Sequence, residues 1–98
     1  MLDSLNYEDY TKQVGTRFEV PDAGVEIELV EVTGRVRTPR QDMFSLVFRG
    51  ARDRPLEQKI HRLRHAALGD GELFLVPVGV DTDGYRYEAG FNRLVDHG

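Results

Sequence analysis

Two of the three histidines, His61 and His65, come closest in type and spacing to a metal site or an acid–base pair. On a helix, two histidines four residues apart share a face and can hold one zinc ion. The segment from Lys59 to His65 instead alternates as a strand does. Four residues of strand span about 13 Å, too far for one ion to bind both rings. We therefore expect structural roles for both histidines and no metal site.

Other patterns resemble catalytic or binding motifs without completing them. Residues 81–84 (DTDG) match the start of a calcium loop, but the position of its bidentate glutamate holds Asn92, so we interpret them as a hairpin turn. Ser4 and Ser45 lie outside a G-x-S-x-G nucleophile elbow. The chain has no cysteine and no phosphate-binding glycine motif. We therefore expect no catalytic, cofactor-binding or metal-binding residues.

Arginine is the functional residue type that the chain concentrates. Residues 35–65 carry nine bases and three acids, whereas residues 1–34 carry two bases and eight acids and residues 66–98 two bases and six acids. Arginine binds carboxylates and phosphates through paired hydrogen bonds, so the middle segment is a candidate docking surface. Its arginines are Arg35, Arg37, Arg40, Arg49, Arg52, Arg54, Arg62 and Arg64.

Three interpretations of these arginines remain open. They could dock an acidic protein partner, contact a polyanion, or pair with Glu26, Glu28 and Glu31 on neighbouring strands. The net charge of −4 argues against nucleic acid, as does the lack of aromatic residues interleaved with the arginines. We expect an acidic protein partner or self-association, and no nucleic acid.

Length and composition are typical of a small globular domain. Ninety-eight residues fit one domain, and 40% apolar with 31% charged residues is ordinary for a folded chain. The first residues lack the basic and apolar regions of a signal peptide, and no apolar run approaches the ~20 residues of a membrane span. We expect a single domain over residues 1–98, located in the cytoplasm and without a membrane segment.

The chain opens with a helix signal and continues with strand signals. Asn6 can cap a helix with support from Asp9, and Gly15 is suited to the position after its end. The spacing predicts a helix over about residues 7–14. A β region follows over about residues 17–92, and residues 93–98 are expected to form a loose tail.

Period-two alternation predicts about six short strands in the β region. A slip in the alternation at Leu29 indicates a β-bulge, and Pro77 indicates a sheet edge or a bulge. Residues 33–42 are interpreted as a basic loop or a frayed strand end. The predicted strand segments are 17–20, 25–32, 43–48, 59–65, 73–78 and 85–91. The start of the 73–78 segment is expected to be buried on both faces.

We therefore expect a mainly β protein. The architecture is a small antiparallel barrel or sandwich of about six strands with one short N-terminal helix.

Several segments together are similar to one bacterial family. They are Leu2–Leu5, the helix end at Val14–Gly15, Phe44–Gly50, Leu63–Gly69, Leu73–Gly79 and Tyr87–Asn92. On these segments the chain resembles the DUF6916 family, a domain of about 100 residues of unknown function. The resemblance implies an association of some members with phage-tail-like proteins and no activity that could be carried over. The stretch Ala51–Lys59 is more charged than the family pattern.

These observations favour a non-enzymatic protein-interaction or assembly module, and the resemblance implies an association with phage tails. Self-association through an edge at the Pro77 strand is one form it could take. The alternative is a small-ligand-binding β barrel or an enzyme with a scattered site. Its first candidates would be His61, His65, Tyr87 and Glu88, provided that they converge in a pocket.

Overall fold

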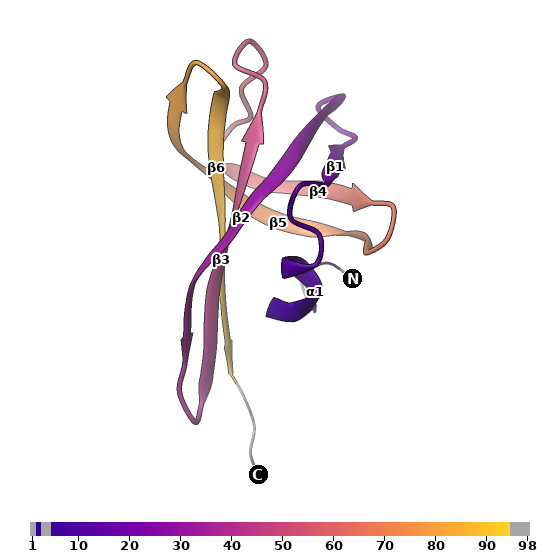
Figure 1. Ribbon diagram of the computed structural model, residues 1–98. Helices are drawn as coiled ribbons and strands as arrows, with labels where there is room; N and C mark the ends of the chain where they lie inside the picture. Colours follow the sequence, from indigo (N-terminus) through magenta and orange to yellow (C-terminus); the bar gives the residue numbers. More distant parts are fainter. Residues whose placement is uncertain (1, 3–4, 95–98) are drawn as a thin grey trace.

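The computed structural model describes residues 2 and 5–94, which contain one short α-helix and six strands (Figure 1). The predicted mainly β class is confirmed. The helix and strands are α1 (Tyr7–Thr11), β1 (Arg17–Val20), β2 (Val25–Arg37), β3 (Gln41–Gly50), β4 (Lys59–His65), β5 (Gly69–Asp81) and β6 (Gly84–Leu94).

The six strands form a closed ring. They pair in the order β1-β2-β3-β6-β5-β4, and β4 returns to β1 where Arg64 lies opposite Glu19. All pairings among the described strands are antiparallel. Of the two architectures that the sequence leaves open, the chain adopts the barrel. Closure pairs the edges that an open sheet would leave bare.

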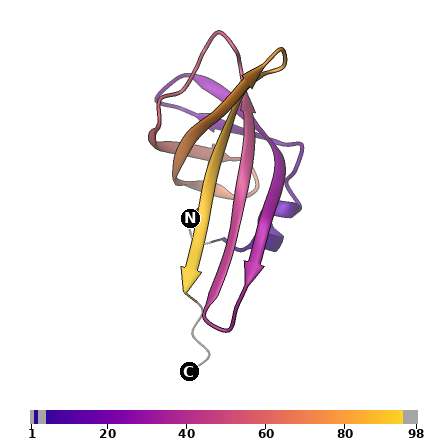
Figure 2. The same ribbon diagram turned by 90° about the vertical axis from the view of Figure 1, so that its left-hand side faces the viewer.

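Three strands continue past the barrel and form what we call the arm: Glu31–Arg37 of β2, Gln41–Leu46 of β3 and Ala89–Leu94 of β6 (Figure 2). The reason is where the neighbouring strands pair, since β5 is 13 residues long but its Gly69–Leu75 half pairs with β4. The described pairing of β5 with β6 covers only the Gly84–Glu88 half of β6, and β1 pairs only with the first residues of β2. The molecule is accordingly elongated, at 47 × 25 × 23 Å.

The barrel interior is filled by side chains that point inward at every second position. This is the expected result of alternation along strands with one face in the core. The buried hydrophobic residues of the strands, in the barrel and on the covered face of the arm, are Phe18, Val20, Ile27, Leu29, Phe44, Leu46, Phe48, Leu63, Leu73, Leu75, Tyr87 and Ala89. His61 and His65 are also buried, on the same inward face as Leu63.

Helix α1 covers one face of the arm through aromatic rings. The Phe44 and Phe91 rings stack on neighbouring strands with centroids 4.9 Å apart. The Tyr7 ring meets Phe44 edge-on at 5.7 Å, and the Tyr10 ring lies 5.5 Å from Phe91. Such pairs contribute about 0.5–1.5 kcal/mol each beyond the area they bury. The helix is therefore held by tertiary contacts, because five residues are too few for a helix to be stable alone.

The start of the predicted helix is confirmed, but its end is wrong. Asn6 and Asp9 form the expected capping box. The helix stops at Thr11 instead of residue 14. The Gly15 amide donates to the Leu29 carbonyl at 2.7 Å, and the Leu29 amide donates to the Thr16 carbonyl at 3.0 Å. The chain has to straighten to make these bonds to β2, so the helical turn cannot continue.

Three strand predictions need correction. Residues 33–42 are mostly strand, because β2 runs to Arg37 and β3 begins at Gln41. The start of the Leu73–Val78 run is buried on one face only, since Phe74 is 49% exposed. The expected tail begins too early, because β6 extends to Leu94; residues 95–98 lie outside the described residues.

The predicted irregularities are confirmed in position. The β2–β3 register shifts between Leu29 and Glu31, and a second shift follows between Thr33 and Val36, where Gly34 has a φ of +67°. The β5–β6 register shifts just after Pro77. Pro77 is paired with Tyr87 of β6, and the described pairing of β5 with β4 ends at Leu75, so Pro77 lies at a sheet edge on its β4 side and beside a bulge on its β6 side.

Neighbouring residues on opposite faces of β5 test this arrangement. Leu75 is fully buried, so Leu75→Ala leaves a cavity and should lower the free energy of unfolding by about 2–5 kcal/mol. Phe74→Ala on the outer face should cost about 1 kcal/mol or less. Urea unfolding followed by circular dichroism measures both. Equal losses for the two variants would contradict the assignment of faces.

Candidate functional site

The eight candidate arginines are spread over separate parts of the molecule. Arg37 and Arg40 lie at the end of the arm, at the β2–β3 turn. Arg52 and Arg54 lie in the β3–β4 loop at the other end of β3, about 30 Å away for a strand of ten residues. Figure 1 shows these two ends pointing in opposite directions. The structure therefore does not bring the predicted set together as one surface.

The remaining four of the eight arginines form ion pairs with acids of the chain itself. Arg35 binds Asp42 at 3.3 Å and Glu8 at 3.2 Å. Arg49 lies 3.4 Å from Glu28 on the neighbouring strand, a partner that the sequence suggested. Such partly exposed pairs are worth only about 0–1 kcal/mol, but they satisfy the arginines. Arg62 and Arg64 both pair with the Asp70 carboxylate, at nitrogen–oxygen distances of 3.7 Å and 3.4 Å respectively.

Arg35 joins α1 to the arm. Its guanidinium lies 4.3 Å from the centroid of the Tyr7 ring and binds Asp42 from β3 and Glu8 from the helix. The hydrogen bond to Asp42, and then that to Glu8, raise the pKa of Arg35 above its ordinary value. The pKa of Glu8 is lowered, first by a backbone hydrogen bond at Glu8 itself and then by Arg35. Arg35 is thus a structural residue more than a free docking group.

The tip of the arm has a defined backbone that presents Arg40. The Thr38 hydroxyl accepts hydrogen bonds from the backbone amides of Arg40 at 3.3 Å and Gln41 at 2.9 Å. The Thr38 amide donates to the Gln41 carbonyl at 2.8 Å, which closes the turn. Arg37 and Arg40 are both exposed, and no ion pair joins either to another residue of the described chain.

An apolar pair on the outside of the barrel is the feature that sequence reasoning missed. Ile60 on β4 lies directly opposite Phe74 on β5, and the two are 61% and 49% exposed. Arg62 opposite Glu72 and Arg64 opposite Asp70 continue the same outward row. The signal was present in the sequence, because strict alternation around the inward Leu73 and Leu75 places Phe74 outside.

His65 is held in one neutral form by its surroundings. Its Nδ1 accepts from the backbone amides of Ala67 at 3.0 Å and Leu68 at 3.1 Å, so this nitrogen carries no proton. Its Nε2–H therefore donates to the Thr16 hydroxyl at 2.8 Å, which in turn donates to the Gln13 carbonyl at 2.7 Å. Burial lowers the pKa of His65. This network fixes the β4–β5 turn against β1.

The other candidates for a scattered active site do not converge with His65. The His61 ring contacts the Glu57 carbonyl at 2.7 Å. Tyr87 points into the barrel, where its hydroxyl accepts from the Leu56 amide at 2.8 Å, whereas Glu88 is exposed on the outside. Within the described residues, no group of three or more His, Cys, Asp and Glu side chains could hold a metal ion.

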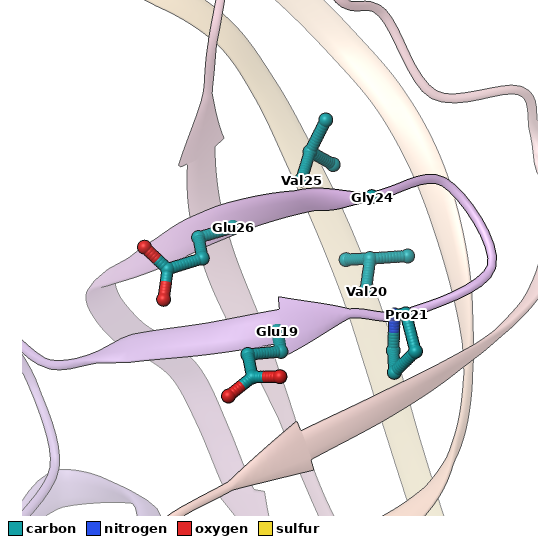
Figure 3. A pocket seen from close by; sticks show the side chains of 6 residues that line it. All are labelled: Glu19, Val20, Pro21, Gly24, Val25 and Glu26. Carbon is teal, nitrogen blue, oxygen red and sulfur yellow. The ribbon is translucent and has the colours of Figure 1, made fainter.

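A hollow of about 360 Å³ lies at the β1–β2 hairpin (Figure 3). Its charged lining residues, Glu19 and Glu26, sit opposite each other across the two strands and point to the same side. Both are exposed and open to water, so they lack the enclosed environment that general acid–base chemistry needs. None of His61, His65, Tyr87 and Glu88 lines this hollow.

Residues 81–84 form the predicted hairpin turn. The Asp81 carboxylate accepts from the Asp83 amide at 2.8 Å, which lowers the pKa of Asp81, and it also pairs with Arg86 at 3.4 Å. A carboxylate used in this way closes the turn.

Helix α1 has only five residues, and no helix in the part of the chain described here is long and apolar enough to cross a membrane.

The His65 network predicts a pH-dependent stability. Because the folded-state pKa of His65 lies below the ordinary value of about 6.5, this contribution is complete above pH 6.5 and is lost as pH falls toward the folded-state pKa. His65→Asn keeps an acceptor near the Nδ1 position but does not titrate. It should flatten the pH dependence between pH 7 and 5, measured by urea unfolding. An unchanged pH slope in this variant would contradict the assignment.

The Tyr87 hydroxyl predicts a second effect on stability. Tyr87→Phe keeps the ring but leaves the buried Leu56 amide without its acceptor, which should cost about 1–3 kcal/mol of unfolding free energy. Because Leu56 anchors the β3–β4 loop, hydrogen exchange of residues 51–58 should also accelerate. A loss confined to residues far from this loop would argue against the role of the hydroxyl.

Comparisons with known proteins agree with the resemblance seen in the sequence. Neither the comparison with curated proteins nor the comparison with solved structures finds a match. Residues 5–91 match the family described as a domain of unknown function, DUF6916. The match extends from just before α1 through most of β6, and therefore includes the helix, the barrel and most of the arm. The chain belongs to the DUF6916 family.

Proposed function

We propose that this protein is a non-enzymatic protein-interaction module, an assembly component that docks an acidic protein partner at the tip of its arm. The observation that carries the proposal is the exposure of Arg37 and Arg40 at that tip, where no described acid pairs with them. The nearby Asp42 is already bound to Arg35. The tip therefore presents two exposed arginines outside any described ion pair on a projecting hairpin, although Asp42 lies opposite Arg37 and Glu8 is within its electrostatic reach.

Electrostatics supports an acidic partner at this position. Like charges at a projecting end attract an oppositely charged surface over roughly 8–10 Å at ordinary salt concentration and increase the rate of encounter. Each exposed contact contributes little affinity alone, so docking at the tip is salt-sensitive. Arg62 and Arg64 are weaker candidates, because Asp70 is shared between them and lies close by.

The contents of the barrel favour this proposal over a ligand-binding or catalytic one. A small-ligand barrel needs an interior cavity, and this interior holds aromatic and aliphatic side chains such as Phe18, Phe48 and Leu75. The hydrogen bonds that engage His65 and Tyr87 are structural. The ligand-binding or enzymatic alternative would have to use an open surface hollow, such as the one at the β1–β2 hairpin.

The setting of the module is part of the proposal. It includes a cytoplasmic location, proposed from the sequence, and a bacterial cell with a phage-tail-like protein as the class of partner, which the resemblance to the bacterial family supports. Such tails are built from many copies of the same proteins, so they would offer a small docking module repeated binding sites.

Charge reversal at the tip tests the proposal. Binding of a fluorescent ten-residue polyglutamate peptide at 50 mM salt should weaken at least tenfold in the Arg37→Glu/Arg40→Glu variant and fall steeply with added salt. The control, Arg17→Glu/Arg52→Glu, makes the same change in net charge away from the arm and should stay within twofold of wild type. Circular dichroism confirms that both variants fold.

Two outcomes of this experiment would reject the tip as the docking site. Equal losses in the two variants would show that net charge alone governs binding. Tighter binding of a DNA duplex than of the peptide would replace the protein partner with a nucleic acid. Affinity capture from host lysate at low and high salt, with the same pair of variants, then identifies the natural partner.

A further inference from the structure

The two edges of the arm differ in a way that bears on assembly. On the β6 side, the described pairing with β5 ends at Glu88, so Ala89–Leu94 has a strand neighbour only in β3 among the residues described. On the β2 side, β3 is likewise the only strand neighbour of Glu31–Arg37 within the described part of the chain. Unpaired backbone amides and carbonyls along such edges are sites where another strand can add.

The β2 edge carries features that hinder strand addition. Two register shifts interrupt it, at Leu29/Glu31 and at Thr33/Val36, and Gly34 adopts a positive φ between them. Bulges twist an edge away from a neighbour, and charged side chains such as Arg37 have the same protective effect. This edge is therefore unsuited to regular pairing.

The β6 edge is regular. Its ten consecutive pairs with β3, from Gln41 opposite Leu94 to Gly50 opposite Tyr85, contain no register shift. Arg93 is its only charged residue between Ala89 and Leu94. Leu94 is 85% exposed, which is the highest exposure among the large hydrophobic residues described. A regular, nearly uncharged edge with an exposed leucine is prone to pair with another strand.

We propose that the β6 edge pairs antiparallel with the same edge of a second copy, about a two-fold axis at Asn92. The proposal deepens the assembly function proposed above but uses residues other than the arginines of the tip. In an isologous pair of this kind, residues equally distant from the axis lie opposite each other. Asn92 then faces Asn92 of the second copy.

The sequence of the edge is self-complementary about this axis. Phe91 faces Arg93 of the second copy, so the pair would repeat the contact already made within one chain, where the Arg93 guanidinium lies 5.0 Å from the Phe91 ring centroid. Leu94 faces Gly90 of the second copy. A Cβ atom at Gly90 would meet only the Ser45 hydroxyl, at 3.9 Å, so the space beside Gly90 is open to receive a leucine.

Neighbouring registers are less favourable. An axis at Arg93 would place two arginines directly opposite each other, which is destabilising in a β-sheet. An axis at Phe91 would place Leu94 opposite Glu88 of the second copy, where β5 already occupies the edge through Val76. The observed pairing and the charges therefore select Asn92 as the centre.

Cysteine cross-linking tests this register directly, because the native chain contains no cysteine. Directly opposite residues have Cβ atoms about 4.5–5.5 Å apart, close enough for a disulfide after a small adjustment. Asn92→Cys should therefore form a disulfide-linked dimer under mild oxidation at micromolar concentration. The matched control is Val36→Cys, an exposed position on the opposite edge of the same arm, which should cross-link at least tenfold more slowly.

A second substitution separates pairing from chance collision. Adding Leu94→Lys to Asn92→Cys should slow cross-linking at least tenfold, because the lysine replaces the apolar contact over Gly90. Equal cross-linking rates for Asn92→Cys and Val36→Cys would overturn the proposal. Analytical ultracentrifugation gives a second test. A wild-type dimer that is dissociated by Phe74→Ser but not by Leu94→Lys would also overturn the proposal. Cross-linking at Asn92 does not depend on Arg37 or Arg40. A negative cross-linking result would therefore reject the β6 pairing and leave the proposed docking at the tip unaffected.

Discussion

The pairing of β3 with β6 is the interaction on which the rest of the structure depends. Its ten residue pairs run without a register shift from the barrel into the arm. At one end the two strands join the ring, with Tyr87 in the interior. At the other end they provide Phe44 and Phe91, against which α1 packs. Barrel, arm and helix are thus attached to one continuous ladder of backbone hydrogen bonds.

The polar groups inside the molecule are used for structure. Among the described residues, no buried side-chain nitrogen or oxygen lacks a hydrogen-bond partner. An unpaired buried polar group costs about 1–3 kcal/mol, so networks such as that of His65 keep turns and loops in place. The groups with capacity left for other molecules lie outside, at Arg37 and Arg40, at the Ile60–Phe74 pair and along the β6 edge.

Most of the fold was predictable because its signals are local. Alternation located the strands, although the start of β5 was wrongly expected to be buried on both faces, and the capping residue Asn6 placed the start of α1. The errors arose where a distant partner decided the outcome. Residues 33–37 have a basic, loop-like composition but form strand because β3 supplies their hydrogen bonds. The helix ends early because Gly15 and Thr16 bond to Leu29, fourteen and thirteen residues further along the chain.

By itself, the sequence determined the β class, the turns, the bulge positions and the arginine-rich middle segment, because each depends on residues close together in the chain. Only the tertiary structure decided that the ring closes and that β2, β3 and β6 continue as an arm beyond the residues that pair with β1 and β5. It also separated Arg37 and Arg40 from Arg52 and Arg54 by the length of β3. Strand register and the extent of each strand are set by pairing between distant segments. The alternation within one strand does not indicate which segment it pairs with.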